Sequence, residues 1–328
     1  MDLIQVANQQ RQAPPEDARN FLLPVESNFI VANTEQIPII DLKENHTIPV
    51  FAKDNERTIS HLEFIETVQF VTSKVFNGEV ITEPAIRVSH PIKGRIPSAV
   101  NKPVKELLEH EKTLYFERMA FIVEIPSIQT EIGGNLLNLT IGGVRAYNLE
   151  KLYSRKSEEH FKVFIGFQNK VCTNMCISTD GYKSDIRVRT LTELANVVYN
   201  LIVRFNIERQ IEFLRKFPEY QLREGEFAQL VGRTRMYQMM PYKYRKDIPA
   251  FPLSDSQVNL VVKDYYSDYS FSREMDGSIN LWKLYNLFTG ANKMSYIDTF
   301  MDKGLGCTHF LSDIHKAKSK SEYYWYLS

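Results

Sequence analysis

Apolar and polar positions repeat with two different periods along the chain, and the order of these periods predicts the fold class. Between residues 113 and 178, aromatic and β-branched residues alternate or cluster between glycine turns, which is typical of antiparallel strands. Between residues 190 and 303, apolar residues recur every three or four positions, which is typical of amphipathic helices. We therefore expect an α+β fold in which an antiparallel β region is followed by a helical region.

Capping patterns predict where several helices begin. Ser60 and Thr190 are each followed three positions later by Glu, and Ser254 is followed by Gln257 at the same distance. One helix is expected early in the chain, starting at Ser60, and a single long helix is expected from residue 190 to the stop at Pro218. Further helices are expected over residues 225–240, 254–266, 280–290 and 295–303.

Glycine and proline mark the boundaries in the β region. The pairs Gly133-Gly134 and Gly142-Gly143 predict two tight turns around a short strand over residues 136–141. Four prolines between residues 79 and 103 predict an irregular segment. Residues 171–178 predict a strand that would carry both Cys172 and Cys176.

These patterns divide the chain into four parts. We expect a flexible arm over residues 1–30, a mainly β region with one early helix over 31–190, a helical region packed on it over 191–315, and a polar, fraying tail over 316–328.

Composition excludes several classes of protein. The chain has 328 residues, 40 basic and 40 acidic, with 43% apolar and 12% aromatic residues, which rules out a disordered chain, a collagen-like chain and a disulfide scaffold. Three cysteines indicate free thiols in a reducing compartment. We see no signal peptide and no apolar run long enough to cross a membrane, so a cytoplasmic location without membrane contact is expected.

Charge is uneven although the total is zero. Residues 181–250 hold 13 basic and 8 acidic groups, and within them residues 232–246 hold five basic groups, three tyrosines and no acid. Basic groups neutralise phosphates and tyrosine rings stack on bases, so this stretch predicts contact with nucleic acid. The candidate residues are Arg233, Arg235, Tyr237, Tyr242, Lys243, Tyr244, Arg245 and Lys246.

A structural explanation competes with nucleic-acid contact for the basic stretch. Basic residues at the end of a helix are also favoured by the helix dipole, and tyrosines with methionines often belong to a core.

Near the C-terminus, side chains of the kinds that bind zinc cluster at unusual spacing, so a metal site competes with a plain surface turn. These residues are Cys307, His309, Asp313 and His315. No phosphate-binding loop, dinucleotide fingerprint, nucleophile elbow or zinc-protease motif occurs, and no cofactor and no catalytic residue are expected.

Four short motifs resemble known bacterial sequences. N-x-V-C-x-N at Asn169 and W-x-x-x-N-x-x-T at Trp282 resemble a group of uncharacterised phage- and plasmid-related proteins. The run from Phe227 to residue 238, together with GGVRAYN at Gly142, is similar to a closer family, a domain of unknown function found on conjugative transposons and plasmids. The closer resemblance covers roughly residues 84–302. It implies a cytoplasmic protein of a mobile element and carries no known activity.

Taken together, the sequence predicts a non-enzymatic accessory protein that contacts nucleic acid, in particular single-stranded nucleic acid. The alternative is a protein-interaction module that engages a host-defence or replication partner, encoded by the host or by the element, which the neutral charge and the aromatic content favour. An unrecognised metal-dependent hydrolase is a third hypothesis, and it depends on the C-terminal cysteine and histidine cluster.

Overall fold

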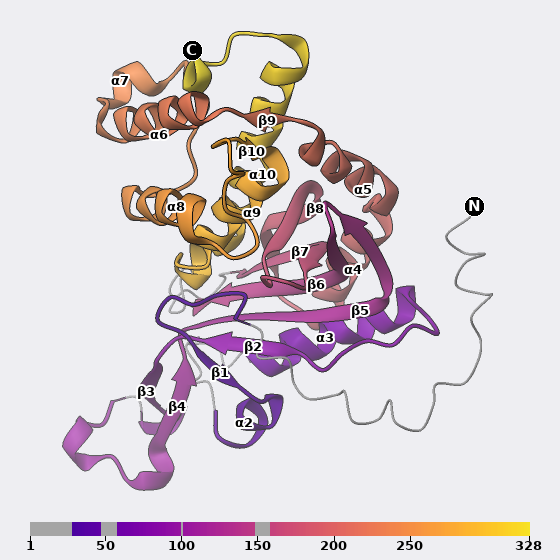
Figure 1. The fold of residues 1–328 in the computed structure, drawn as a ribbon. Helices are drawn as coiled ribbons and strands as arrows, with labels where there is room; N and C mark the ends of the chain where they lie inside the picture. The colour runs from indigo at the N-terminus through magenta and orange to yellow at the C-terminus, as the bar shows by residue number, and fades with distance from the viewer. Residues whose placement is uncertain (1–27, 47–57, 100, 148–157) are drawn as a thin grey trace.

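The computed structural model describes residues 28–46, 58–99, 101–147 and 158–328, and the fold is α+β as the sequence predicts. One antiparallel sheet of six strands forms its centre, in the order β1 (Glu35–Ile37), β2 (Ala85–Val88), β5 (Arg118–Ile132), β6 (Asn135–Ala146), β7 (Glu159–Asn169) and β8 (Met175–Val188). Figure 1 shows this sheet below a group of helices from the C-terminal part of the chain.

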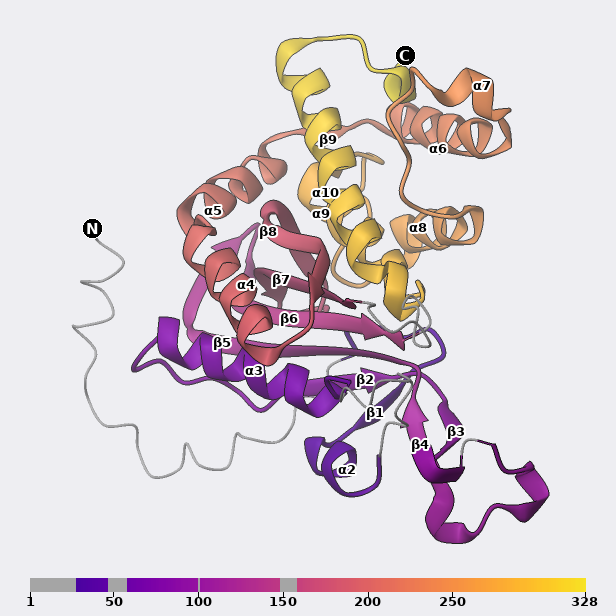
Figure 2. The ribbon, with the colours of Figure 1, turned by 180° about the vertical axis from the view of Figure 1, so that it is seen from behind.

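The two faces of the sheet are covered by helices from different parts of the chain. Helices α3 (His61–Val75) and α4 (Leu191–Arg204) pack together on one face, and α10 (Ile297–Lys320) packs on β8, β6 and β5 (Figure 2). Side chains alternate accordingly, because successive residues of a strand point to opposite faces. Phe121 of β5 lies in the larger core against Phe64 of α3, at 5.2 Å between ring centroids, whereas its neighbour Ile122 lies in the second core with Phe300 of α10.

The strands depart from the sequence prediction at the second glycine pair. Gly133 and Gly134 form the β5–β6 turn with φ of 54° and 78°, as expected. Gly142 and Gly143, however, lie inside β6 and not in a turn. A Cβ on Gly143 would come within 2.4 Å of the Phe64 ring, so this glycine makes room for a helix on the sheet.

The segment over residues 79–103 is also more regular than expected. It contains β2, which pairs with β5, and β3 (Pro91–Arg95), which pairs with β4 (Lys112–Phe116) in a separate two-stranded ribbon. This ribbon and the turns that follow β3 project from the body of the molecule (Figure 1). Pro84 directly precedes β2 and Pro91 is the first residue of β3, a strand position that tolerates proline, so these prolines do not prevent strand formation.

Helix boundaries agree with the capping patterns, with one break. Ser60 accepts a hydrogen bond from the Glu63 amide at 3.0 Å, and the Glu63 carboxylate accepts one from the Ser60 amide at 2.7 Å. The long helix expected from residue 190 is two helices, α4 and α5 (Ile207–Arg215), because Phe205 turns into the core with extended dihedrals and Asn206 caps the second helix.

The remaining helices form the second half of the molecule. They are α6 (Glu224–Met239), α7 (Tyr242–Arg245), α8 (Asp255–Ser267), α9 (Leu281–Asn292) and α10, and the short helix α2 (Ile39–Glu44) lies near the start. Helix α10 continues well past the expected end at residue 303. Strands β9 (Gln221–Leu222) and β10 (Ile279–Asn280) make a small second pairing.

The two ends of the described chain are ordered differently from the sequence prediction. Residues 1–27 of the expected arm lie outside the described residues, but Phe29 and Ile30 are buried in the second core. The tail expected to fray from residue 316 belongs to α10 and to the 3₁₀ turn Trp325–Leu327, and Tyr324 and Tyr326 are buried.

A buried amide network joins the helices to the sheet. Asn169, at the end of β7, donates to the side-chain oxygen of Asn286 in α9 at 3.0 Å, and Asn174 donates to the Asn286 carbonyl at 2.8 Å. Lys293, the residue directly after α9, donates to Thr173 Oγ1 at 2.9 Å. The N-x-V-C-x-N motif at Asn169 and the W-x-x-x-N-x-x-T motif at Trp282 therefore meet at one structural junction, where their buried polar groups are hydrogen-bond partners.

No helix in the described part of the chain is long and apolar enough to cross a membrane.

Candidate nucleic-acid interface

The basic and aromatic stretch folds as the end of α6 and the short helix α7. Met240 adopts extended dihedrals before Pro241 and so ends α6, as expected of a residue that precedes proline. Pro241 then precedes the first turn of α7, where its fixed φ and missing amide hydrogen are tolerated. Both helices lie at the edge of the helical half of the molecule, away from the sheet (Figure 1).

All three predicted arginines, Arg233, Arg235 and Arg245, donate hydrogen bonds to other groups of the same chain. Arg233 donates to the carbonyl of Ser328 and lies over the Trp325 ring, 4.8 Å from its centroid. Arg235 donates to the side chain of Asn259 and lies 3.5 Å from an Asp255 oxygen.

Arg245 holds the link between the two helices. Its Nε donates to the Met240 carbonyl at 2.6 Å, and its Nη2 donates to the Gln238 carbonyl. The guanidinium lies 5.2 Å from the Tyr237 ring centroid. Tyr237 itself is half-buried beside Tyr326, so these two predicted residues connect elements within the chain.

The other four predicted residues face outward, and we call them the α7 surface: Tyr242, Lys243, Tyr244 and Lys246. The tyrosines are 79% and 60% exposed. Lys243 Nζ lies 4.6 Å from the Tyr244 ring centroid, and neither lysine forms an ion pair with a carboxylate of the described residues. Asp247 is exposed next to them and lowers the local positive charge.

Sequence reasoning missed the aromatic residues that the end of the chain brings to α6. Trp325 is half-exposed under Arg233, and Tyr323 is 77% exposed. Both lie in the segment that was expected to fray. The available signal was the run of four aromatic residues over positions 323–326, which is unusual for a solvated tail.

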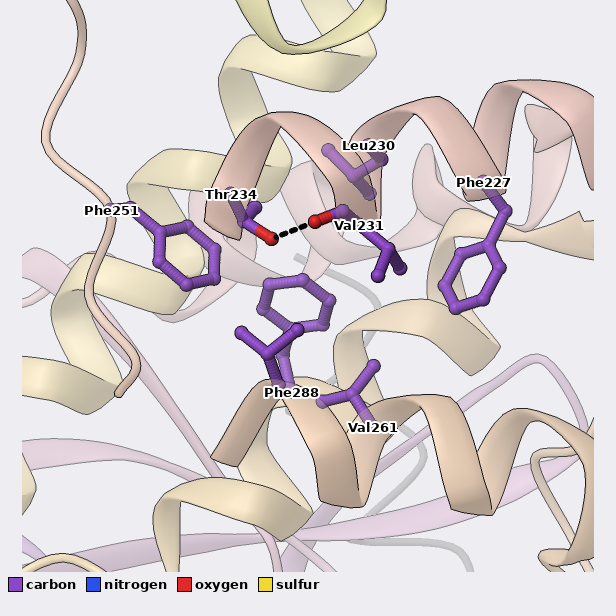
Figure 3. A pocket seen from close by; sticks show the side chains of 8 residues that line it. Phe227, Leu230, Val231, Thr234, Phe251, Val261 and Phe288 are labelled. Carbon is purple, nitrogen blue, oxygen red and sulfur yellow. Dashed lines mark hydrogen bonds between the residues drawn. The ribbon is translucent and has the colours of Figure 1, made fainter. Parts of the chain in front are cut away.

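A small apolar cavity lies beneath α6, between α6, α8 and α9 (Figure 3). It measures about 10 Å³ and is lined by Leu230, Val261 and Phe288, while Thr234 bonds back to the Val231 carbonyl at 2.8 Å. A cavity of this size holds at most one water molecule or methyl group, so it does not suit a small-molecule ligand.

The residues of the proposed metal site diverge along α10. Cys307 points into the core, His309 lies 2.8 Å from Thr179 Oγ1, and Asp313 pairs with Lys316 at 3.0 Å. His315 lies against the Tyr220 ring. Among the described residues no group of three or more His, Cys, Asp or Glu side chains could hold a metal ion.

The two cysteines expected in one strand lie in different elements. Cys172 is in the turn between β7 and β8, and Cys176 is in β8. Both are free thiols. Burial raises the pKa of Cys172 to about 11 and the pKa of Cys176 further still, so both thiols are protonated at neutral pH and neither is an activated nucleophile.

Comparison with known proteins identifies a family but no characterised relative. No curated protein and no solved structure matches the chain. A family model described as "Domain of unknown function, B. Theta Gene description (DUF3871)" matches residues 22–327. Because this match covers nearly the whole sequence, the chain belongs to the DUF3871 family.

Proposed function

We propose that this protein binds single-stranded nucleic acid through the α7 surface. The supporting observation is that two tyrosine rings and two lysines stand exposed within five consecutive positions, and that neither lysine is neutralised by a carboxylate of the described residues. Single-strand binders use this combination, in which cations track phosphates and rings stack on bases.

The arginines have a supporting role in this proposal. Arg245 and Arg233 fix α7 and the C-terminal turn against α6, so the exposed side chains are presented from a rigid base. The zero net charge of the chain argues against strong, nonspecific binding to duplex DNA. We therefore expect modest, salt-sensitive affinity for single strands.

The test is the salt dependence of binding to a fluorescent oligonucleotide. Each phosphate contact with a single strand contributes roughly 0.7 to the slope of log K against log salt, so Lys243→Ala with Lys246→Ala should lower the slope by about 1.4. Lys105→Ala with Lys183→Ala is the matched control, because both are exposed lysines outside α7. No binding at low salt, or equal slopes for the two double variants, would reject the proposal.

The stacking contribution can be tested separately. Tyr242→Ala or Tyr244→Ala should each weaken binding by about 1–3 kcal/mol if the ring stacks on a base. Tyr269→Ala serves as the control, because Tyr269 is fully exposed in the loop after α8, outside the α7 surface.

We further propose, from the sequence resemblance, that the protein acts in the bacterial cytoplasm as an accessory of a mobile genetic element. Localisation of the tagged full-length chain, and the genomic neighbours of its relatives, would test this. A chromosomal setting with no element genes nearby would count against it.

A protein-interaction role is the second candidate. It is supported by the end of α8 and the segment that follows it, where Tyr266, Tyr269 and Met275 are exposed among acidic residues. Tyr265 in the last turn of α8 and Phe271 in the following loop are buried, so both ends of this exposed stretch are anchored to the core. Recovery of one host or element protein that survives nuclease treatment, and that Tyr269→Ala with Met275→Ala abolishes, would favour this role.

A further inference from the structure

Asn77 is the one asparagine in the sequence that is followed by glycine, and it lies in the turn that ends α3. Both Asn77 and Gly78 are exposed. The side chain of Asn77 has no hydrogen-bond partner among the described residues. Gly78 has a φ of 91°, and a Cβ there would meet nothing within 4 Å. The side-chain amide and the peptide bond that follows it therefore stand together in open solvent.

An asparagine and a glycine in this setting can react with each other. The Gly78 nitrogen attacks Cγ of Asn77, so an N–Cγ bond forms and the Cγ–Nδ2 bond breaks. Ammonia leaves with the proton of the Gly78 amide, and a cyclic succinimide remains. Water then opens the ring at one of its two carbonyl groups and gives aspartate or isoaspartate. Glycine favours the attack because it has no side chain to obstruct it and because its backbone rotates freely.

The attacking amide is not held by the fold. The amides before and after this pair are hydrogen-bonded, from Phe76 to the Thr72 carbonyl at 2.9 Å and from Glu79 to the Phe76 carbonyl at 3.1 Å. The Gly78 amide donates to no carbonyl group of the described residues. It is therefore available to solvent and to base, which must remove its proton before it can attack.

Two aspartates, Asp180 and Asp276, are also followed by glycine, but the fold restrains both. Asp276 Oδ1 accepts hydrogen bonds from the Ser278 hydroxyl at 2.7 Å and from the Ser278 amide at 2.9 Å, and these bonds lower the pKa of Asp276. Its carboxylate thus stays ionised and is a poor target for attack. Gly181 lies inside β8, where a Cβ would collide with the backbone of β7, so the chain cannot rearrange there.

We infer that Asn77 is a site of spontaneous deamidation, where the native chain accumulates aspartate and isoaspartate with age. Both products add a negative charge just beyond the C-terminal end of α3, where the helix dipole disfavours it. Isoaspartate also adds a methylene group to the backbone, in a connection that is fixed at Thr82 by a 3.0 Å bond from its amide to the Glu124 carbonyl. Because α3 packs on the sheet, the conversion lowers the stability of the fold.

Incubation of the full chain in warm, mildly alkaline buffer tests the site. Isoaspartate is measured by enzymatic methylation and located by peptide mass mapping. It should appear first at residue 77, and more slowly in mildly acidic buffer. Asn77→Gln should lose most of the methylation, because glutamine must form a larger ring. Asn45→Gln, a change of an exposed asparagine at the end of α2 that is followed by histidine, should keep it. Isoaspartate that appears first at another residue, or at residue 77 only after unfolding in urea, would overturn the inference.

Urea unfolding of the aged chain tests the effect on stability. The aged chain carries an extra negative charge, so ion exchange separates it from the unmodified chain. It should unfold at a lower urea concentration than the unmodified chain. Asn77→Asp adds the charge without the methylene group, so its shift should be in the same direction and smaller. Equal urea midpoints for aged and unmodified chains would overturn the inferred loss of stability.

Discussion

His61 shows how strongly its surroundings change the chemistry of one side chain. It is the first residue of α3, and its ring is buried with Nε2 2.8 Å from the Phe116 carbonyl oxygen. Burial, and then the nearby positive charge of Arg145, lower the pKa of His61 to about 3. The ring is therefore neutral in the native state, and Nε2–H donates to the carbonyl.

We expect His61 to make the folded state less stable in acid. The unfolded chain binds a proton at His61 below about pH 6.5, whereas the native state does not until about pH 3. Its stabilising contribution is thus complete above pH 6.5 and falls by up to about 1.4 kcal/mol per pH unit as the pH drops through this window. Urea unfolding at several pH values should show a shallower acid slope for His61→Gln, while His90→Gln, at an exposed position, should keep the wild-type slope.

Gly143 and Gly232 look alike in the sequence, and they should respond in opposite ways to alanine. At Gly143 the new methyl group would collide with Phe64, so we expect a loss of about 1–3 kcal/mol in the free energy of unfolding. At Gly232 it would meet nothing and improve helix propensity, so we expect a gain of about 0.5–1 kcal/mol in dilute solution. Chemical denaturation of both variants checks this, and a stable Gly143→Ala protein would contradict the packing described here.

At the scale of elements, local patterns identified the helices well, because caps and apolar periods act over a few residues. The starts at Ser60 and Ser254 are confirmed by their hydrogen bonds. The break between α4 and α5 was missed because the apolar period runs through it. Phe205 leaves the helix to pack under Gly181, where a Cβ would lie 2.9 Å from its ring, and this contact between distant residues has no local signal.

Asn206 gives a direct test of that break. Its side chain accepts a hydrogen bond from the Arg209 amide at 2.8 Å and so caps α5. Asn206→Ala should lower the free energy of unfolding by about 1 kcal/mol. Asn200→Ala, a change of an exposed asparagine within α4, should have little effect, and equal losses in the two variants would contradict the capping role.

At the scale of the whole molecule, the order of strands and helices was sufficient to predict the α+β class. It was not sufficient to place β2 beside β5 or to fold the end of the chain, because both depend on pairing between distant segments. Contacts between distant segments also limited the prediction of the candidate nucleic-acid interface. The sequence predicted its residue types, but it could not show that Arg233 and Arg235 are engaged by Ser328 and Asn259.

Tyr326 tests how much the end of the chain contributes to stability. It is fully buried, donates to the Pro249 carbonyl at 2.7 Å and packs against Phe310. Tyr326→Ala should cost about 3–5 kcal/mol, as large aromatic deletions in cores do. Tyr323→Ala, at an exposed neighbour, should change stability by less than about 0.5 kcal/mol, and a fraying tail would instead give two equally small effects.

The contact between Tyr326 and Pro249 also has a consequence for synthesis on the ribosome. The two residues are 77 positions apart, so the base of the α7 surface is translated long before the segment that holds it in place. A nascent chain that has only just exposed α7 therefore lacks the aromatic support beneath it. If the α7 surface binds single strands as proposed, binding should arise only after residue 326 has been translated.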